Sequence, residues 1–119
     1  MKKLLLPITF IILLFTFLTS CSNEEKSTLE GRYLKSTNDS HMIIVDSSGP
    51  IVMTNQSKKA TLFDNLKTGD KIKITCTAVT ESYPGGCGVY NITLLERGNI
   101  EDINKETLDK LKEMGWIDN

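Results

Sequence analysis

The stretch KIKITCTA, residues 71–78, carries the clearest secondary-structure signal in the chain. Its apolar residues alternate with lysine and threonine, and successive side chains of a β-strand point to opposite sides. One face of this strand would therefore hold Ile72, Ile74, Cys76 and Ala78. A sheet with one apolar face has to bury that face in a core. The alternation predicts a β domain with Cys76 on the buried side.

Further strand signals lie on both sides of this stretch. Downstream, GVYNITLLE at 88–96 alternates again, and we expect Tyr90, Ile92 and Leu94 on its core side. Between the two strands, Tyr83-Pro84-Gly85-Gly86 fits a type II turn, which uses the fixed φ of proline and a positive φ at glycine. Upstream, three strands are expected, and the last two form a hairpin: GRYLKS at 31–36, HMIIVD at 41–46 and IVMT at 51–54.

Two segments have helical spacing instead. In TLFDNLKTGD, residues 61–70, the apolar side chains fit a single helical turn that Gly69 would end. In the last twenty residues the apolar positions recur every three or four residues. This spacing predicts a terminal helix that Asn99 or Asn104 would cap and Gly115 would end, with one face packed on the sheet.

These elements predict a mainly β fold, a small five-stranded antiparallel barrel of the OB type with a C-terminal α-helix, over residues 29–119. The segments LKTGDKIKI and ESYPGG, with the strand that follows, resemble small uncharacterised secreted or lipoprotein domains of Gram-positive bacteria that have an OB-like barrel. The resemblance covers about residues 60–97. It implies the fold and brings no catalytic residue to this chain.

The N-terminus has the layout of an export signal. Two lysines precede an apolar run of 15 residues, Leu4–Leu18, which is shorter than the ~20 residues of a membrane-spanning helix. Leu18-Thr19-Ser20-Cys21 follows and resembles the lipobox of bacterial lipoproteins. The resemblance implies a signal peptide at 1–20 and a lipid on Cys21, which would anchor the chain to the extracytoplasmic face of the cell membrane. An ordinary cleaved signal and an uncleaved membrane helix remain the alternatives.

The rest of the chain would be a short tether and one small domain. Residues 21–28 are expected to form a flexible tether, because they are polar and have no apolar period. Cleavage before Cys21 would leave 99 residues, with 12 basic against 15 acidic side chains. Such a negative domain with scattered lysines argues against nucleic acid as a partner, since nucleic-acid binding depends on clustered Lys and Arg.

Cys76 and Cys87 are the two cysteines outside the predicted anchor. Outside the cytoplasm two thiols in a small domain often join, so we expect a disulfide, with reduced and buried thiols as the alternative. In a tight hairpin that turns at Pro84-Gly85, however, Cys76 would face a residue near position 93. A bond to Cys87 would need a wider loop.

The sequence offers no coherent catalytic or metal-binding set. His41 is the only histidine, so a Ser-His-Asp relay could be built only around it. Asp39 and Ser40 stand next to it, but residues that are neighbours in sequence rarely have the geometry of such a relay. A zinc site would need three or four converging Cys or His ligands. The glycines at 85, 86 and 88 lack the helix and lysine of a phosphate loop. We therefore expect neither an enzyme nor a cofactor.

The best candidate for ligand contact is ESYPGG, residues 81–86. Glu81, Tyr83 and Pro84 would lie there on an exposed, rigid loop, although Tyr83 could instead cap the barrel. The expected function is a non-enzymatic binding module for a protein, peptide or envelope ligand. The alternatives are an accessory subunit of an envelope complex, recognised through the helix and Trp116, and a small hydrolase built around His41.

Overall fold

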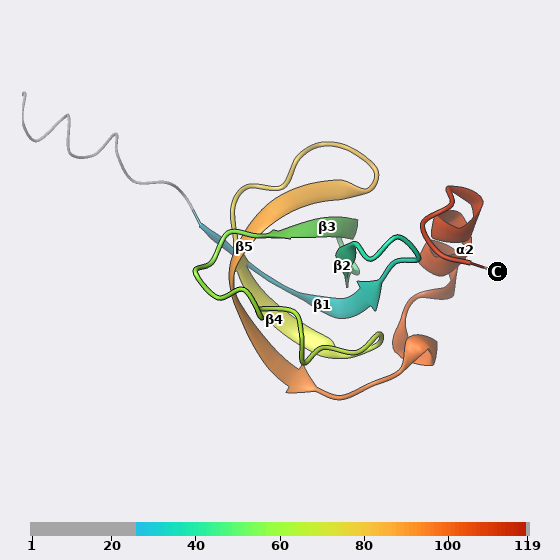
Figure 1. Cartoon of the computed structure of the whole chain (residues 1–119). Coiled ribbons are helices and arrows are strands. Elements are labelled where there is room, and N and C mark those ends of the chain that lie inside the picture. Colours follow the sequence, from blue (N-terminus) through green and yellow to red (C-terminus); the bar gives the residue numbers. More distant parts are fainter. Residues whose placement is uncertain (1–25, 119) are drawn as a thin grey trace, which may run out of the picture.

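Five strands close into a barrel in the order β1-β2-β3-β5-β4, and a short helix lies beside it (Figure 1). The computed structural model describes residues 26–118, so Cys21, the predicted signal peptide and most of the predicted tether lie outside the described residues. The elements are β1 Ser27–Lys35, β2 His41–Val45, β3 Gly49–Asn55, β4 Lys71–Cys76, β5 Gly85–Glu96, the 3-10 turn η1 Ile100–Asp102 and α2 Lys105–Glu113. The predicted mainly β barrel with a C-terminal helix is confirmed, and its first strand begins two residues before Leu29.

One strand pair departs from the predicted antiparallel barrel. β3 and β5 run parallel, with Ile51 opposite Gly85 and Asn55 opposite Val89, whereas the other strand pairs are antiparallel. The reason is geometric, because an odd number of strands cannot alternate in direction all the way round a closed ring. The barrel is therefore mixed, and its strand order is compatible with an OB-like fold.

The barrel interior holds the main core. β4 keeps its predicted alternation as far as Cys76, with Ile72, Ile74 and Cys76 buried and the residues between them more exposed. The strand ends there, and Ala78, which was predicted on the same face, is exposed. Each fully buried large apolar side chain contributes about 1.5–3 kcal/mol, so this cluster is the main source of stability. Its buried members come from all five strands and from the segment before β4: Tyr33, Ile43, Val45, Ile51, Met53, Phe63, Ile72, Ile74, Cys76, Cys87 and Val89.

β5 changes its buried face along its length. Val89 is buried and Ile92 packs against the same core, although an odd number of steps separates them. The register explains the change, because Cys76 lies opposite Val89 while Thr75 lies opposite Asn91, which leaves Tyr90 as the extra residue of a β-bulge. The predicted core side of this strand is therefore wrong for Tyr90 and for Leu94, which is 39% exposed, and holds for Ile92.

The predicted helical turn before β4 is a series of single turns. Backbone N–H groups between residues 62 and 66 donate to carbonyls three residues earlier, at 3.1–3.3 Å, without forming a helix. Phe63 is buried, and Leu62 and Leu66 pack against the barrel core. Gly69 ends the segment with a φ of 101°, which favours glycine, and a Cβ there would lie 2.1 Å from the Asn99 carbonyl oxygen.

The C-terminal segment forms two helical pieces where one helix was predicted. Ile103 is extended and separates η1 from α2. Each piece has its own cap, because the Asn99 side chain accepts from the Glu101 N–H and the Asn104 side chain accepts from the Thr107 N–H. Both predicted asparagine caps are confirmed.

α2 covers the outer face of β1, β2 and β3. Its residue Leu111 joins Leu34, Met42 and Ile44 of the barrel in a second buried cluster, which Ile103 completes. The cluster is surrounded by Val52, Leu108, Trp116 and Ile117. Gly115, with a φ of 86°, ends the helix, and the Trp116 N–H donates to the Leu111 carbonyl at 2.9 Å in a Schellman motif. The prediction that the helix packs on the sheet is confirmed.

Candidate functional site

Cys76 and Cys87 both lie in the barrel core, and their buried thiols are close enough to affect each other's pKa. The Thr77 N–H donates to the Gly88 carbonyl at 2.8 Å and the Gly88 N–H to the Thr77 hydroxyl at 2.9 Å, so the two strands stay joined past Cys76. The chain does not form the tight hairpin in which Cys76 would face a residue near position 93. Cys76 lies opposite Val89 instead, and the wider loop places Cys87 beside it. Both cysteines are free thiols here, and their disulfide stays a prediction.

The environment of the two thiols makes them poor nucleophiles. Burial raises the pKa of Cys76 above its ordinary value, and burial together with the neighbouring Cys76 raises the pKa of Cys87 to about 12. Since the thiolate is the reactive form of cysteine, neither group would attack a substrate at neutral pH.

The loop that carries Glu81, Tyr83 and Pro84, residues 77–84, is held by its own hydrogen bonds. The Thr80 N–H donates to the Gly86 carbonyl at 3.0 Å, and the Gly86 N–H donates to the Thr80 hydroxyl at 2.9 Å. The predicted type II turn is wrong, because Gly85 and Gly86 begin β5 without a positive φ and the Tyr83–Pro84 peptide is cis.

Within this loop Glu81 is exposed, Pro84 is half-buried and the Tyr83 side chain is 43% exposed. Lys110 of α2 places its Nζ 4.6 Å from the Tyr83 ring centroid, a cation–π contact. Tyr83 therefore has one side against the helix and one side open. The structure keeps the three predicted ligand-binding residues together on one loop, and their role in binding stays a prediction.

The outer face of β2 and β3 is not open. In small barrels of the OB type this face and the adjoining loops contact oligonucleotides and oligosaccharides. Here Met42 and Ile44 of β2 are buried under α2, and Val52 of β3 packs at the edge of the same cluster. Any ligand of this barrel has to use another surface while α2 is in place.

His41 opens β2 and is held by aromatic neighbours. Its Nδ1 lies 2.5 Å from the Tyr33 hydroxyl oxygen, and its ring stacks on Phe63 with centroids 4.2 Å apart. Burial lowers the pKa of His41, with a further contribution from Lys35, and burial raises the pKa of Tyr33 to about 12. These contacts give the imidazole a packing role at the start of β2.

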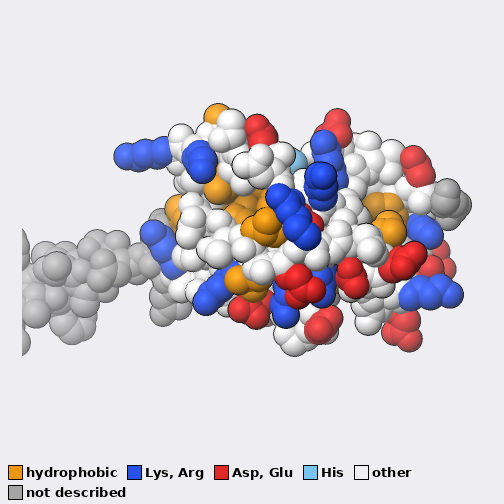
Figure 2. All heavy atoms as spheres, turned by 90° about the horizontal axis from the view of Figure 1, so that it is seen from below, with side chains coloured by type: hydrophobic (Ala, Val, Ile, Leu, Met, Phe, Trp, Pro, Cys, Tyr) orange, Lys and Arg blue, Asp and Glu red, His pale blue; other side chains and the backbone are white. Residues whose placement is uncertain are grey.

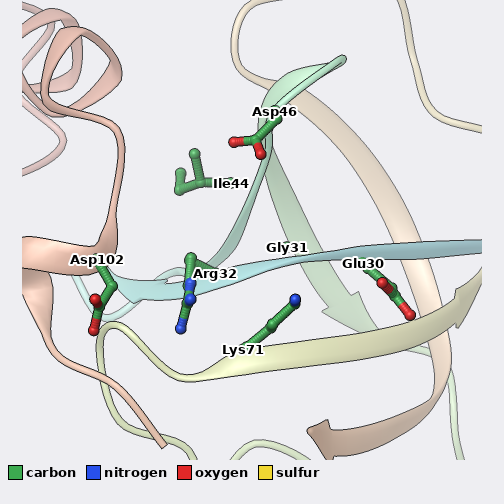
Figure 3. Close-up of a pocket in the computed structure, with 7 residues that line it drawn as sticks. All are labelled: Glu30, Gly31, Arg32, Ile44, Asp46, Lys71 and Asp102. Atoms are coloured by element: carbon green, nitrogen blue, oxygen red, sulfur yellow. The ribbon is translucent and has the colours of Figure 1, made fainter. Parts of the chain in front are cut away.

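A polar pocket of about 300 Å³ lies beside Gly31 (Figure 3). Arg32 and Lys71 point into it between the carboxylates of Asp102 and Glu30, and Asp46 lies above them. Several of these groups already have backbone partners. Arg32 donates to the Gly69 carbonyl at 3.2 Å, and the Asp102 carboxylate accepts from the Asn99 N–H at 2.9 Å. The lining combines two basic side chains with three carboxylates, so positive and negative charges largely balance in this pocket.

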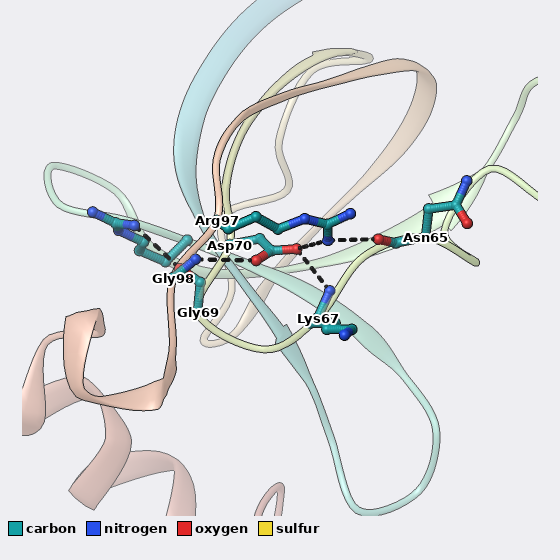
Figure 4. Close-up of polar contacts among 7 residues, drawn as sticks. Asn65, Lys67, Gly69, Asp70, Arg97 and Gly98 are labelled. Carbon is teal, nitrogen blue, oxygen red and sulfur yellow. Dashed lines mark hydrogen bonds and ion pairs between the residues drawn. The ribbon is translucent and has the colours of Figure 1, made fainter.

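Asp70 is a fully buried carboxylate that links several segments (Figure 4). One oxygen accepts from the Lys67 N–H at 2.9 Å and from the Arg97 guanidinium at 2.8 Å, and the other accepts from the Gly98 N–H at 3.2 Å. Burial by itself would raise the pKa of Asp70, but these donors outweigh it and hold the pKa below its ordinary value. Arg97 also donates to the Asn65 carbonyl at 2.9 Å, so the same network ties the turns before β4 to the end of β5.

A second hollow, about 370 Å³, runs between those turns and the second half of β5. We call it the β5 groove; it is lined by Lys59, Thr61, Leu62, Asn65, Leu66, Asn91, Ile92, Leu94 and Arg97. The view from below the barrel, the side on which β5 ends in Figure 1, shows exposed hydrophobic side chains with both basic and acidic side chains around them (Figure 2). Sequence reasoning missed this groove and the Asp70 network. Both depend on contacts between segments about thirty residues apart, which no local pattern reveals.

Between residues 26 and 118 no group of three or more His, Cys, Asp or Glu side chains converges in a way that could hold a metal ion. In the same part of the chain no helix is long and apolar enough to cross a membrane.

No family model matches the chain, and neither a curated protein nor a solved structure matches it. Its function has to be argued from its own residues.

Proposed function

We propose that this protein is a lipoprotein, held at the extracytoplasmic face of the cell membrane by a lipid on Cys21, whose barrel is a non-enzymatic binding module for a protein, peptide or envelope ligand. The observation that carries the proposal is Leu18-Thr19-Ser20-Cys21 directly after an apolar run of 15 residues. A cysteine with two or more acyl chains would anchor stably, since each buried methylene contributes about 0.8 kcal/mol while a single chain binds only marginally.

The short connection between Cys21 and the barrel supports this placement. β1 begins at Ser27, six residues after Cys21, and six residues span at most roughly 20 Å when fully extended. β1 starts at the end of the barrel away from α2 (Figure 1). The start of β1 would therefore lie near the membrane, and α2 would lie on the far side.

The positions of the unusual titratable groups support binding over catalysis. The groups with displaced pKa values are Tyr33, His41, Asp70, Cys76 and Cys87. Active sites commonly gather such groups in a cleft. Here each of the five takes part in an internal contact, and none of them lines the polar pocket or the β5 groove.

The alternative of an accessory subunit recognised through the helix and Trp116 has less support. Trp116 packs in the cluster under α2, and its carbonyl accepts from the Thr37 N–H at 2.9 Å. The apolar side of the helix is used within the molecule, so a partner would meet mainly its polar side.

The anchor is tested by Cys21→Ser in cells fed a labelled fatty acid. The wild-type chain should take up label and fractionate with membranes, whereas Cys21→Ser should lose the label and accumulate as precursor. Cys76→Ala is the matched control and should keep the label, because it removes a different cysteine. Label that persists in Cys21→Ser would reject the lipoprotein proposal.

The binding role is tested by pull-down from envelope extract with the wild-type chain and Tyr83→Ala. If the loop at 77–84 takes part, the variant should lose the partner, because it removes the exposed ring face. A partner retained in full by Tyr83→Ala would exclude this loop from the binding surface.

We also propose that Cys76 and Cys87 form a disulfide at the cell exterior by exchange with an external disulfide, which takes up the two electrons and two protons and is reduced to two thiols. Their thiols are already close together, and closing a loop of about ten residues would stabilise the fold by somewhat under ~3 kcal/mol. Alkylation of unreduced protein under denaturing conditions should leave both cysteines unlabelled. Labelling of both would reject the bond.

A further inference from the structure

The second half of β5 has one unpaired edge. β3 pairs with β5 only from Gly85 to Val89, while β4 pairs with β5 from Val89 to Glu96. Within residues 26–118 no strand therefore lies along the other side of the stretch 91–96. In an antiparallel pair alternate N–H and C=O groups point away from the neighbour, so this stretch offers backbone donors and acceptors to an added strand.

The unpaired edge borders the β5 groove. Leu62 and Leu66 line the groove from the turns, and Ile92 and Leu94 line it from β5. The volume of about 370 Å³ lies within the range of roughly 300–1,000 Å³ found for small-ligand pockets. A strand that paired with β5 would thus place alternate side chains against an apolar lining.

The charges that line the groove favour a ligand with a negative charge. The charged residues that line the groove are Lys59 and Arg97, both cations, in a chain with a net negative charge. Arg97 uses Nη1 for Asp70 and Asn65, and 55% of its side chain stays exposed. A carboxylate beside these two cations would find charge-assisted hydrogen bonds. The polar pocket beside Gly31 offers no such bias, because it mixes both signs of charge.

We propose that the β5 groove binds an extended peptide segment of a partner protein, which adds as a strand to residues 91–96. Its apolar side chains contact Leu62, Leu66 and Leu94, and an acidic side chain contacts Lys59 or Arg97. Strand addition of this kind takes affinity from main-chain hydrogen bonds and specificity from pockets for alternate side chains. The inference rests on the binding-module part of the proposed function and does not depend on the lipid.

The first test uses the full chain in detergent micelles and synthetic peptides of about six residues, the usual strand length. Valine and threonine alternate in these peptides, and one glutamate is moved through every position. We expect binding by a subset of them, and at least tenfold weaker binding when lysine replaces the glutamate, about 1.4 kcal/mol. No binding by any peptide up to about 1 mM would overturn the proposal.

Backbone methylation separates strand addition from simple apolar contact. Two versions of the best peptide carry N-methyl groups on the odd or the even residues. Only one of the two should lose affinity, because alternate N–H groups of an added strand face β5. Equal effects of the two patterns would contradict strand pairing.

Bound peptide should also slow amide hydrogen exchange within 91–96, and protection confined to residues 77–84 would place the site elsewhere.

Matched variants locate the groove. Leu94→Glu puts a negative charge into it and should weaken binding of the glutamate peptide at least tenfold. Met114→Glu is the control, because Met114 is similarly exposed but lies outside residues 91–96 and does not line the groove. Lys59→Glu reverses a positive charge that lines the groove and should also weaken binding. Lys58→Glu is its control, because Lys58 does not line the groove. Loss of binding in the control of either pair, in protein with wild-type circular dichroism, would overturn the assignment.

Three further outcomes are decisive. Concentration-dependent dimerisation that protects the amides of 91–96 would overturn the proposal, since a second copy would then be the occupant. Lipid labelling of Cys21 without peptide binding would leave the anchor standing and reject this inference alone. Peptide binding by a chain that is never lipidated would support this inference and reject the lipid anchor.

Discussion

The barrel has two apolar regions on its outer surface, one covered by α2 and one exposed. Outside β1 and β2, Leu34 and Ile44 are at most 3% exposed because α2 lies over them, and Leu111 of α2 is fully buried against them. Along the second half of β5, Leu94 and Leu95 remain 39% and 44% exposed. The covered region contributes to folding through burial, whereas the exposed leucines gain little from it. The peptide site proposed above would bury the side of this stretch that carries Leu94.

Truncation of the covered region should have the largest effect. Leu111→Ala removes a fully buried side chain and leaves a cavity between α2 and the barrel, so we expect a loss of about 3 kcal/mol in the free energy of unfolding. Urea denaturation measures it. Met114→Ala, at a residue 45% exposed just after the same helix, should change stability by less than about 0.5 kcal/mol. Similar losses in the two variants would mean that α2 does not seal this face.

The Asp70 network ties the turns before β4 to the end of β5, and its loss should rank second. Asp70→Asn keeps the shape but gives up a charge-assisted bond to Arg97, which costs about 2 kcal/mol. Asp64→Asn, at an exposed aspartate in the turns, is the control and should be nearly neutral. If Asp70→Asn were equally neutral, the network would not hold the β5 groove in place.

The same carboxylate gives a pH dependence whose sign follows from its lowered pKa. Its contribution is fully present above the unfolded value of about 3.9 and is lost as pH falls through the lower folded pKa. Wild-type stability should therefore fall below about pH 4 more steeply than that of Asp70→Asn. Parallel curves in acid would assign the loss to other groups.

The covered region could largely be predicted from the sequence, and the open one could not. Gly115 is a local signal that correctly placed the end of the helix, while the start was left open between Asn99 and Asn104. The parallel pairing of β3 with β5 follows from barrel closure, and the bulge at Tyr90 follows from pairing with β4, so neither has a local signal. The β5 groove depends on both of these features.

The N-terminal cap of α2 should have a smaller effect than the network. Asn104→Ala removes the acceptor for the Thr107 N–H and should cost about 1 kcal/mol, while Asn104→Ser should recover most of it. Thermal unfolding of the two variants measures the difference. A loss near that of Leu111→Ala would show that the cap also fixes the contact between α2 and the barrel.

The smallest effect belongs to the open region and tests the comparison most directly. Leu94→Ala and Leu95→Ala should each lower stability by less than about 1 kcal/mol, because both side chains keep a large exposed fraction in the folded state. Their peptide affinities should nevertheless differ, since only Leu94 lines the β5 groove. A loss of about 3 kcal/mol in Leu94→Ala would instead make this leucine part of the core, and the contrast between the two regions would fail. A small loss of stability with a large loss of affinity is what separates a surface kept for a partner from one used for folding.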